Sequence, residues 1–316
     1  MTRRLFARVA GVDADCVALL QSLAEAAATV ARSVLPVLRQ GEIVLADREF
    51  RSNVMPWVQF ASSAHSIRLV SDIDGADWTQ RVVDSISSRT ALVAISEVQS
   101  ASGARLHVEE VAHRCRRVGA ELFLNLTQSA GVLQCDLEAL GADYAAAHGY
   151  KWLLAPRGAA WLYVRRDHVR RLTALAPNWK NAPHAHEQMY GVPQRLADDA
   201  RRLDCSLAWP VWAGARAALQ LVLSLPAAKV ESHCLALAAE LREELAALGW
   251  ETVRISAPSH IVSALVPDAG AVALRLADAN VVATAREGLL RFGCHYFNSR
   301  DDVAAVPAAL TAVLSK

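Results

Sequence analysis

Short apolar runs alternate with helix-like patterns between about residues 40 and 165. Short runs of apolar and β-branched residues are typical of buried strands, whereas apolar residues three or four positions apart indicate one face of a helix. Strands that alternate with helices favour a parallel sheet with crossover helices. The strands that we predict are Glu42–Ala46, Ser66–Val70, Thr90–Ile95, Glu121–Leu126, Ala142–Ala147 and Ala159–Val164.

Two segments have a clear helical period. In Val108–Val118 the apolar residues recur at helical spacing, and Gly119 is a stop signal directly after them. Ser22–Leu38 also reads as a helix, and it follows the apolar run Val17–Leu20. We therefore expect a strand that leads into a helix start at this second place too.

The pattern changes after residue 165. The irregular stretch Ala176–Val192 contains proline and histidine, and it predicts a loop over or near a site. The remaining pattern is α+β, so we expect a large α/β domain over residues 1–210 and a small α+β domain over residues 211–316. Its elements are helices at Val211–Leu225, Val230–Leu248, Ala271–Ala279 and from Asp301, and extended runs at Glu251–Ile255, His260–Val266, Val281–Thr284 and Gly288–Phe292.

Composition narrows the class of protein. The chain has 316 residues, of which 53% are hydrophobic and 21% charged, as in a folded protein with a large core. A formal net charge of +1 gives no reason to expect a nucleic-acid partner, and no apolar run reaches the ~20 residues that span a bilayer. Six scattered cysteines without a CxxC pair indicate reduced thiols in a cytoplasmic protein. The expected partner is a small molecule or another protein.

One of only four lysines in the chain has unusual neighbours. Lys151 lies between aromatic and aliphatic residues in Tyr150–Leu154, directly after a predicted strand. Apolar surroundings lower the pKa of a lysine and free the neutral amine for Schiff-base chemistry with a carbonyl. From these residues alone, a lysine that packs its stem and keeps its ammonium in water is the favoured alternative. No group of histidines or cysteines has metal-ligand spacing, so we expect no metal site.

A series of motifs surrounds this lysine and extends over nearly the whole chain. They are Glu49–Asn53 with Pro56-Trp57, Thr90–Ser96 with Gly103–Leu106, Leu124–Gly131, Gly141–Asp143, Gly149–Gly158, Leu290–Phe292, His295–Asn298 and Asp301-Asp302. Together and in this order they resemble the class V aminotransferase family, which includes cysteine desulfurases, kynureninases and isopenicillin-epimerase-like proteins. The resemblance implies a pyridoxal 5′-phosphate (PLP) enzyme of fold type I, an α/β fold with a mainly parallel sheet and a smaller α+β domain. Lys151 falls at the position of the lysine that forms a Schiff base with the cofactor.

The resemblance also implies roles for three further residues. Phe50 falls where relatives stack a ring on the pyridine of PLP, and Gln128 matches the residue that contacts the phenolic oxygen. Arg291 falls where relatives bind the substrate α-carboxylate, which suits a planar guanidinium. Without the resemblance, the same residues would read as a core phenylalanine, a loop glutamine and a surface salt bridge.

The sequence departs from the family pattern at two ends of the cofactor. Asn125 stands where relatives usually carry an aspartate that pairs with the protonated pyridine nitrogen, so we expect slow or absent transamination. The phosphate turn keeps one hydroxyl, Ser22, while Glu25 adds a like charge beside the anion. His148 and, across a dimer interface, Ser206 could supply the missing donors.

Two further departures concern the substrate. The chain starts about where an additional segment of the relatives ends, so we expect some substrate contacts to be absent or to come from another chain. The cysteine loop of desulfurases has no counterpart, because the short segment Ala283–Arg291 lacks cysteine and Cys294 reads as a core residue. Desulfuration through a persulfide is therefore not expected.

Two functions from different classes fit these observations. The favoured one is a homodimeric PLP enzyme acting on an amino-acid substrate, with Lys151 as the cofactor-binding lysine and general base. The alternative is a degenerate homologue that keeps the fold and serves as a binding or scaffold subunit, as Asn125 and the altered phosphate turn suggest. Retention of Lys151, Gln128 and Arg291 favours the enzyme.

Overall fold

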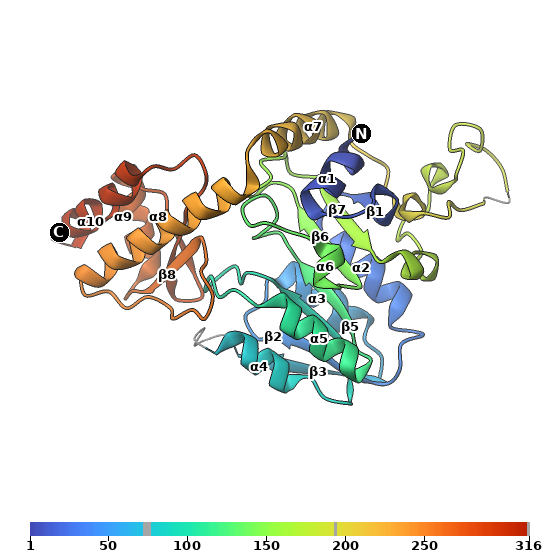
Figure 1. The fold of residues 1–316 in the computed structure, drawn as a ribbon, viewed down its shortest axis with the longest axis horizontal. Coiled ribbons are helices and arrows are strands. Elements are labelled where there is room, and N and C mark those ends of the chain that lie inside the picture. The colour runs from blue at the N-terminus through green and yellow to red at the C-terminus, as the bar shows by residue number, and fades with distance from the viewer. Residues whose placement is uncertain (72–76, 193–194, 315–316) are drawn as a thin grey trace.

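A seven-stranded sheet forms the centre of the computed structural model, which describes residues 1–71, 77–192 and 195–314 (Figure 1). The strand order is β1-β7-β6-β5-β4-β2-β3. β7 is antiparallel to both of its neighbours, and the other strands of this sheet run in one direction. The strands are β1 (Val17–Leu20), β2 (Gly41–Ala46), β3 (His65–Val70), β4 (Thr90–Ser96), β5 (Glu121–Asn125), β6 (Tyr144–His148) and β7 (Ala160–Val164).

Helices cover the sheet on both faces and continue into the C-terminal part (Figure 1). They are α1 (Thr2–Ala10), α2 (Leu23–Val34), α3 (Arg51–Phe60), α4 (Trp78–Ser85), α5 (Val108–Val118), α6 (Leu137–Leu140), α7 (Trp209–Ser224), α8 (Ala227–Ala247), α9 (Ala269–Asp278) and α10 (Arg300–Leu314). Among the described residues, no single helix is long and apolar enough to cross a membrane. α7 and α8 meet the criteria of length and hydropathy only as a pair, which is bent by 86° at its break.

Successive residues of the central strands pack on opposite faces of the sheet. On β2, Val44 lies in the core with residues of α1, α4, α5 and α7, whereas Ile43 and Leu45 lie in the core with residues of α2 and α3. Both faces are buried in this way, as is usual for parallel strands. The ends of the strands are therefore the places where this sheet can build a site.

The C-terminal part contains a separate three-stranded antiparallel sheet, with strand order β8-β10-β9. Its strands are β8 (Ile261–Leu265), β9 (Thr284–Arg286) and β10 (Leu289–Gly293). Leu241 of α8, Leu276 of α9 and Leu310 of α10 pack against Leu290 in its core. α8 leads from the large sheet into this unit (orange in Figure 1). The domain boundary near residue 210 stays a prediction.

The connection after β7 is mostly irregular. Figure 1 shows the predicted loop Ala176–Val192 (yellow-green) projecting from the body of the molecule. Short 3-10 helices occur here and elsewhere in the chain, at η1 (Ala14–Cys16), η2 (Arg166–Arg171), η3 (Trp179–Asn181) and η4 (Ala200–Leu203).

The structure confirms the mainly parallel α/β sheet and corrects two extended runs. α5 has the predicted bounds, and Gly119 ends it with a left-handed φ of 70°. Glu251–Ile255 is not a continuous strand, because it contains only single bridge residues, Thr252, which pairs with Ala264 of β8, and Ile255. The predicted strand Val281–Thr284 begins too early, because β9 starts only at Thr284. The Val281 N–H instead donates to the carbonyl of Leu276 and completes the end of α9.

Candidate functional site at the carboxyl edge of the sheet

The parallel strands end at one edge of the large sheet, and most predicted site residues follow these ends. In open α/β sheets, ligands bind at this edge. We call the resulting group the carboxyl-edge site, and it consists of Ser22 after β1, Glu49 and Phe50 after β2, Ser96 of β4, Asn125 and Gln128 at the end of β5, and His148 and Lys151 at the end of β6.

Lys151 lies in the tight connection between β6 and β7. Gly149 anchors this connection, because its N–H donates to the carbonyl of Ala159 (2.8 Å) and its carbonyl accepts from the N–H of Ala155 (2.9 Å). A Cβ at position 149 would come within 2.8 Å of the Cβ of Ala155 and of the Trp161 ring. Only glycine therefore fits where the chain turns towards the lysine.

The amine of Lys151 is partly withdrawn from water. Its Nζ lies 5.3 Å from the centre of the Tyr150 ring. Burial lowers the pKa of Lys151, and nearby arginine charges, first among them that of Arg291, lower it further. A lowered pKa leaves more neutral amine near pH 7, which suits an amine nucleophile.

Gln128 connects the lysine turn to the small sheet. Its Oε1 accepts hydrogen bonds from Nε1 of Trp152 (3.1 Å) and from Nη2 of Arg291 (3.4 Å), and its Nε2 donates to Oγ of Ser100 (3.1 Å). Trp152 directly follows Lys151 in the chain. The structure thus brings Lys151, Gln128 and Arg291 together, although the sequence separates them widely.

Arg291 reaches this place from β10 without an acidic partner. Burial, with a smaller contribution from the charge of Arg286, lowers the pKa of Arg291 to about 10. Its Nε is buried without a hydrogen-bond partner, and no carboxylate pairs with Arg291 among the residues that the structure describes. Arg291 and Lys151 therefore form a cationic pair that favours an anionic ligand.

Asn125 is held in a defined orientation at the end of β5. Its side chain is buried, and its Oδ1 accepts a hydrogen bond from the N–H of Thr127 (3.0 Å). Its Nδ2 donates to Oγ of Ser96 (2.8 Å). Within the Asn125 amide, only the oxygen can accept a hydrogen bond from a backbone N–H. The Thr127 N–H therefore fixes which way the amide of Asn125 points.

Two rings follow strand ends at the carboxyl edge, Phe50 after β2 and His148 at the end of β6. Phe50, at the start of α3, is 46% exposed, so ring surface is accessible to a flat ligand. His148 packs edge-on against Tyr150, with ring centroids 4.4 Å apart, and its Nε2 is buried without a partner. Burial, with a smaller contribution from the charge of Arg157, lowers the pKa of His148 to about 4, so the ring is neutral near pH 7.

The turn before α2 is closed by the chain's own carboxylate. Oγ of Ser22 accepts a hydrogen bond from the N–H of Glu25 (3.1 Å), and Oε2 of Glu25 accepts one from the N–H of Gln21 (2.7 Å). Nε2 of Gln21 donates to the carbonyl of Ser206 (3.3 Å), so Ser206 lies beside this turn in the same chain. The helix end expected to bind phosphate thus carries a negative charge of its own.

Three residues of this region received no role from the sequence. Glu49 accepts hydrogen bonds from Ser96, and Trp152 holds Gln128. Glu49 and Ser96 follow or end parallel strands, and that position was the available signal for them. Trp152 carried no such signal, because its contact with Gln128 depends on the fold.

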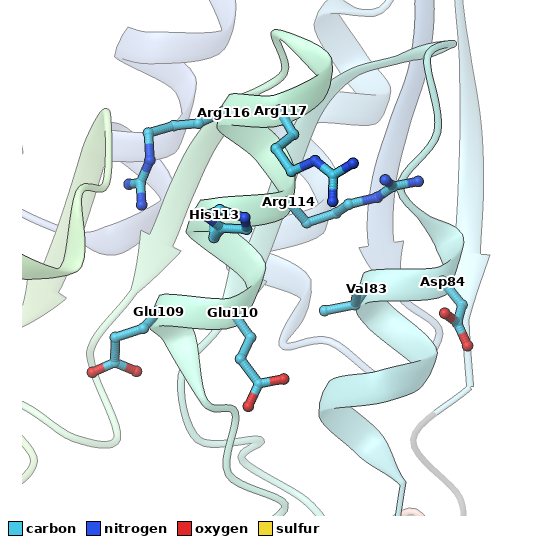
Figure 2. Close-up of a pocket in the computed structure, with 8 residues that line it drawn as sticks. All are labelled: Val83, Asp84, Glu109, Glu110, His113, Arg114, Arg116 and Arg117. Carbon is cyan, nitrogen blue, oxygen red and sulfur yellow. The ribbon is translucent and has the colours of Figure 1, made fainter.

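A hollow on the outer surface lies between α4 and α5 and has a different character. Figure 2 shows Val83 and Asp84 of α4 opposite the charged side chains of α5. Those side chains are Glu109, Glu110, His113, Arg114, Arg116 and Arg117. No predicted site residue lines this hollow.

Comparison with known proteins agrees with the motifs and the fold. The family model described as aminotransferase class-V matches residues 1–306, and the chain belongs to this family. Members of the family are PLP-dependent enzymes, so PLP is the cofactor that membership indicates for this chain.

The similar proteins carry out several reactions. An uncharacterized aminotransferase of Bacillus subtilis (strain 168), YcbU, is 26% identical over 95% of this chain and 80% of the relative. The isopenicillin N epimerase of Amycolatopsis lactamdurans is 27% identical over 98% of this chain and 83% of the relative. The apo structure of a cysteine desulfurase from Thermococcus onnurineus NA1 superposes with a TM-score of 0.89 at 19% identity, covering 99% of this chain and 83% of that one. The expected family and fold type are confirmed, whereas the reaction is left open.

The donor set at the carboxyl edge fits PLP at the ring and at the aldehyde. An amine with a lowered pKa, an accessible aromatic ring and two amides of fixed orientation occupy this end. For the phosphate, the candidate donors are Nε2 of His148, which has no partner among the described residues, and the hydroxyl of Ser22. The carboxylate of Glu25 at the same turn disfavours a bound anion. The site therefore fits the cofactor, with its weakest complement at the phosphate.

Proposed function

We propose that this chain is a PLP-dependent enzyme acting on an amino acid, with Lys151 binding the cofactor and Arg291 binding the substrate α-carboxylate. The observation that carries the proposal is the cation of Arg291, which has no carboxylate partner in the described part of the chain and which Gln128 holds beside the lysine turn. A buried guanidinium without a carboxylate partner is costly unless an anionic ligand completes it. The cofactor, when bound, supplies an electron-withdrawing ring for chemistry at the α- or β-carbon.

The other residues of the site would bind and orient the ligands. Phe50 would stack on the pyridine ring, Gln128 would contact the phenolic oxygen and Asn125 would face the pyridine nitrogen. His148 and Ser22 would donate to the phosphate. Nζ of Lys151, whose pKa burial and the charge of Arg291 lower, would accept the α-proton of the substrate in its neutral form.

We also propose that the chain does not desulfurate cysteine through a persulfide. β9 and β10 are joined by a turn of only two residues, Glu287 and Gly288, which leaves no loop to carry a cysteine. Cys294 follows β10 in the core of the small sheet, and burial raises its pKa to about 12. A buried thiol with that pKa is a poor nucleophile. Release of sulfide from L-cysteine with a persulfide on Cys294 would contradict this assignment.

A homodimer is a further part of the proposal. Large apolar side chains are exposed on the projecting loop, including Tyr190 at 92% and Val192 at 96%. Exposed apolar surface of this kind is favoured at an interface between subunits. Sedimentation at micromolar concentration should show a dimer, and a pure monomer would contradict it.

The test of the cofactor site uses absorption and mass spectrometry together. PLP added to the protein should give a band between about 300 and 500 nm, and borohydride should then fix the cofactor on the peptide that contains Lys151. Lys151→Ala should abolish both signals, whereas Lys180→Ala, on the projecting loop, should leave them unchanged. A fixed cofactor on another lysine would overturn the assignment.

A second candidate function is a non-catalytic binding subunit. The carboxylate of Glu25 at the α2 N-terminus and the uncharged Asn125 favour it, because both weaken the complement to the cofactor. Cofactor fixed on Lys151 without turnover of any amino acid would support this candidate. Turnover that depends on Arg291 would exclude it.

A further inference from the structure

Glu49 places a buried carboxylate behind Asn125. Its side chain is 5% exposed at the end of β2 and accepts four hydrogen bonds. The donors are the N–H of Phe50 (3.0 Å), the N–H of Ser96 (2.7 Å), Oγ of Ser96 (2.5 Å) and Nε2 of Gln99 (3.1 Å). No cation pairs with Glu49 in the described part of the chain. A buried acid without a cation is costly, so its retention here calls for a compensating positive group.

The hydrogen bonds from Asn125 to Glu49 all run in one direction. Thr127 fixes Oδ1 of Asn125, so its Nδ2 donates to Oγ of Ser96. The Ser96 hydroxyl has accepted this bond, and its own proton is free to donate to the Glu49 carboxylate. Such a chain polarises each member in the same sense and makes Oδ1 of Asn125 a stronger acceptor.

We propose that Glu49 is a positioning residue that acts through Ser96 and Asn125 to keep the pyridine nitrogen of the bound cofactor protonated. An aspartate at position 125 would supply the negative charge directly, whereas here the charge stands two hydrogen bonds away. The inference rests on the proposed function, in which Asn125 faces that nitrogen. It makes the uncharged Asn125 compatible with catalysis, because the site as a whole keeps a carboxylate.

The ionisation of Glu49 depends on the balance of two effects. Burial raises the pKa of Glu49, and the hydrogen bonds from Ser96, Gln99 and Phe50 lower it. Three of the four contacts come from N–H donors, which only an unprotonated oxygen accepts well. A protonated pyridine ring at Asn125 would supply the compensating positive charge that Glu49 lacks among the described residues.

The experiment measures the protonation state of the cofactor directly. Protein loaded with PLP labelled with ¹⁵N in the ring should show the resonance of a protonated pyridine. Glu49→Gln and Ser96→Ala should each move this resonance towards the neutral form and weaken PLP binding by roughly tenfold. Ser96→Ala keeps Glu49, so it tests the connection even where Glu49→Gln fails to fold.

Rescue and control variants separate the proposed role from a structural one. The double variant Glu49→Gln with Asn125→Asp moves the carboxylate to the nitrogen and should restore the protonated resonance. Glu97→Gln removes a neighbouring buried carboxylate that contacts Arg105 and should leave the resonance unchanged. If bound PLP shows the same ¹⁵N shift in wild type, Glu49→Gln and Ser96→Ala, the role of Glu49 is overturned but the proposed function is not. A wild-type protein that binds no PLP would overturn the proposed function and this inference together.

Discussion

The Glu25 carboxylate accepts a hydrogen bond from the backbone N–H of Gln21 across 2.7 Å. This contact occupies the start of α2, where a helix would otherwise present free N–H groups to a phosphate. Ser22 caps the same turn by accepting from the N–H of Glu25, so two backbone donors of this turn are occupied without any ligand. Phosphate binding at this position must therefore compete with the chain's own acid.

Removal of this charge is expected to tighten cofactor binding. Glu25→Gln keeps an oxygen for the Gln21 N–H and removes the like charge beside the phosphate. We expect the Kd for PLP to fall roughly tenfold, about 1.4 kcal/mol, in an absorption titration. Glu109→Gln, in the first turn of α5, makes the same change beside the hollow of Figure 2 and should have no effect. An unchanged Kd in Glu25→Gln would mean that the phosphate binds elsewhere.

Lys151 should be the most reactive lysine of the apoprotein near neutral pH. Burial and the charge of Arg291 lower its pKa, so its neutral form is present at a lower pH than that of an ordinary lysine. Competitive acetylation followed by mass spectrometry compares it with Lys180 and Lys229 in one sample. The pH midpoint of Lys151 should lie below theirs and move upward in Arg291→Gln, which removes a positive neighbour. Equal midpoints in wild type and variant would contradict the coupling between the two cations.

Gly149→Ala should destabilise the protein and misplace the lysine turn. The new Cβ would approach the Cβ of Ala155 and the Trp161 ring to 2.8 Å, and forced contacts of this kind typically cost about 1–3 kcal/mol. Urea unfolding should show this loss, accompanied by weaker PLP binding. Gly270→Ala in α9, where the nearest atom to a new Cβ is Oδ1 of Asp268 at an ordinary contact distance of 3.9 Å, is the matched control and should cause no loss. Equal stability of the two variants would show that the turn can yield.

The sequence predicted what local pattern determines. The alternation of strands and helices gave the parallel sheet, because each strand is a short apolar run and α5 has one apolar face. α3 escaped the pattern, since Pro56 lies inside it and few of its residues are buried. The apolar side chain of Val281 predicted the start of a strand. Its backbone N–H instead forms a hydrogen bond that completes α9, which the side chain does not reveal.

The candidate site was predictable only as far as single motifs reach. Lys151, Gln128 and Arg291 were found through their motifs, but the hydrogen bond from Arg291 to Gln128 crosses from the small sheet to the large one. The partnership of Glu49 with Asn125 requires the register of β4 and β5, which places Ser96 beside Asn125. Such pairings depend on strand order, which no local pattern contains.

Acid should destabilise the protein through histidines that are buried in their neutral form, and His260 is the clearest case. It is fully buried, its ring packs edge-on against Trp152, and among the described residues no side chain donates to or accepts from its ring nitrogens. Burial, with a smaller contribution from the charge of Arg291, lowers its pKa from 6.5 to about 3. The unfolded chain takes up a proton near pH 6.5 and the folded chain does not, so stability is present above pH 6.5 and falls as the pH drops towards 3.

The contribution of His260 can be isolated with one substitution. His260→Phe keeps a ring against Trp152 and removes the titrating group, so its free energy of unfolding should fall less between pH 6.5 and 5 than that of wild type. The expected difference is about 1.6 kcal/mol, because the unfolded chain is half protonated at pH 6.5 and almost fully protonated at pH 5 while the folded chain stays neutral. Urea unfolding at the two pH values measures it, and His113→Gln, on the exposed face of α5, should behave as wild type. Parallel losses in wild type and His260→Phe would mean that His260 is not the group that resists protonation, and that His148 or His295, whose pKa values burial lowers to about 4, carries the acid sensitivity instead.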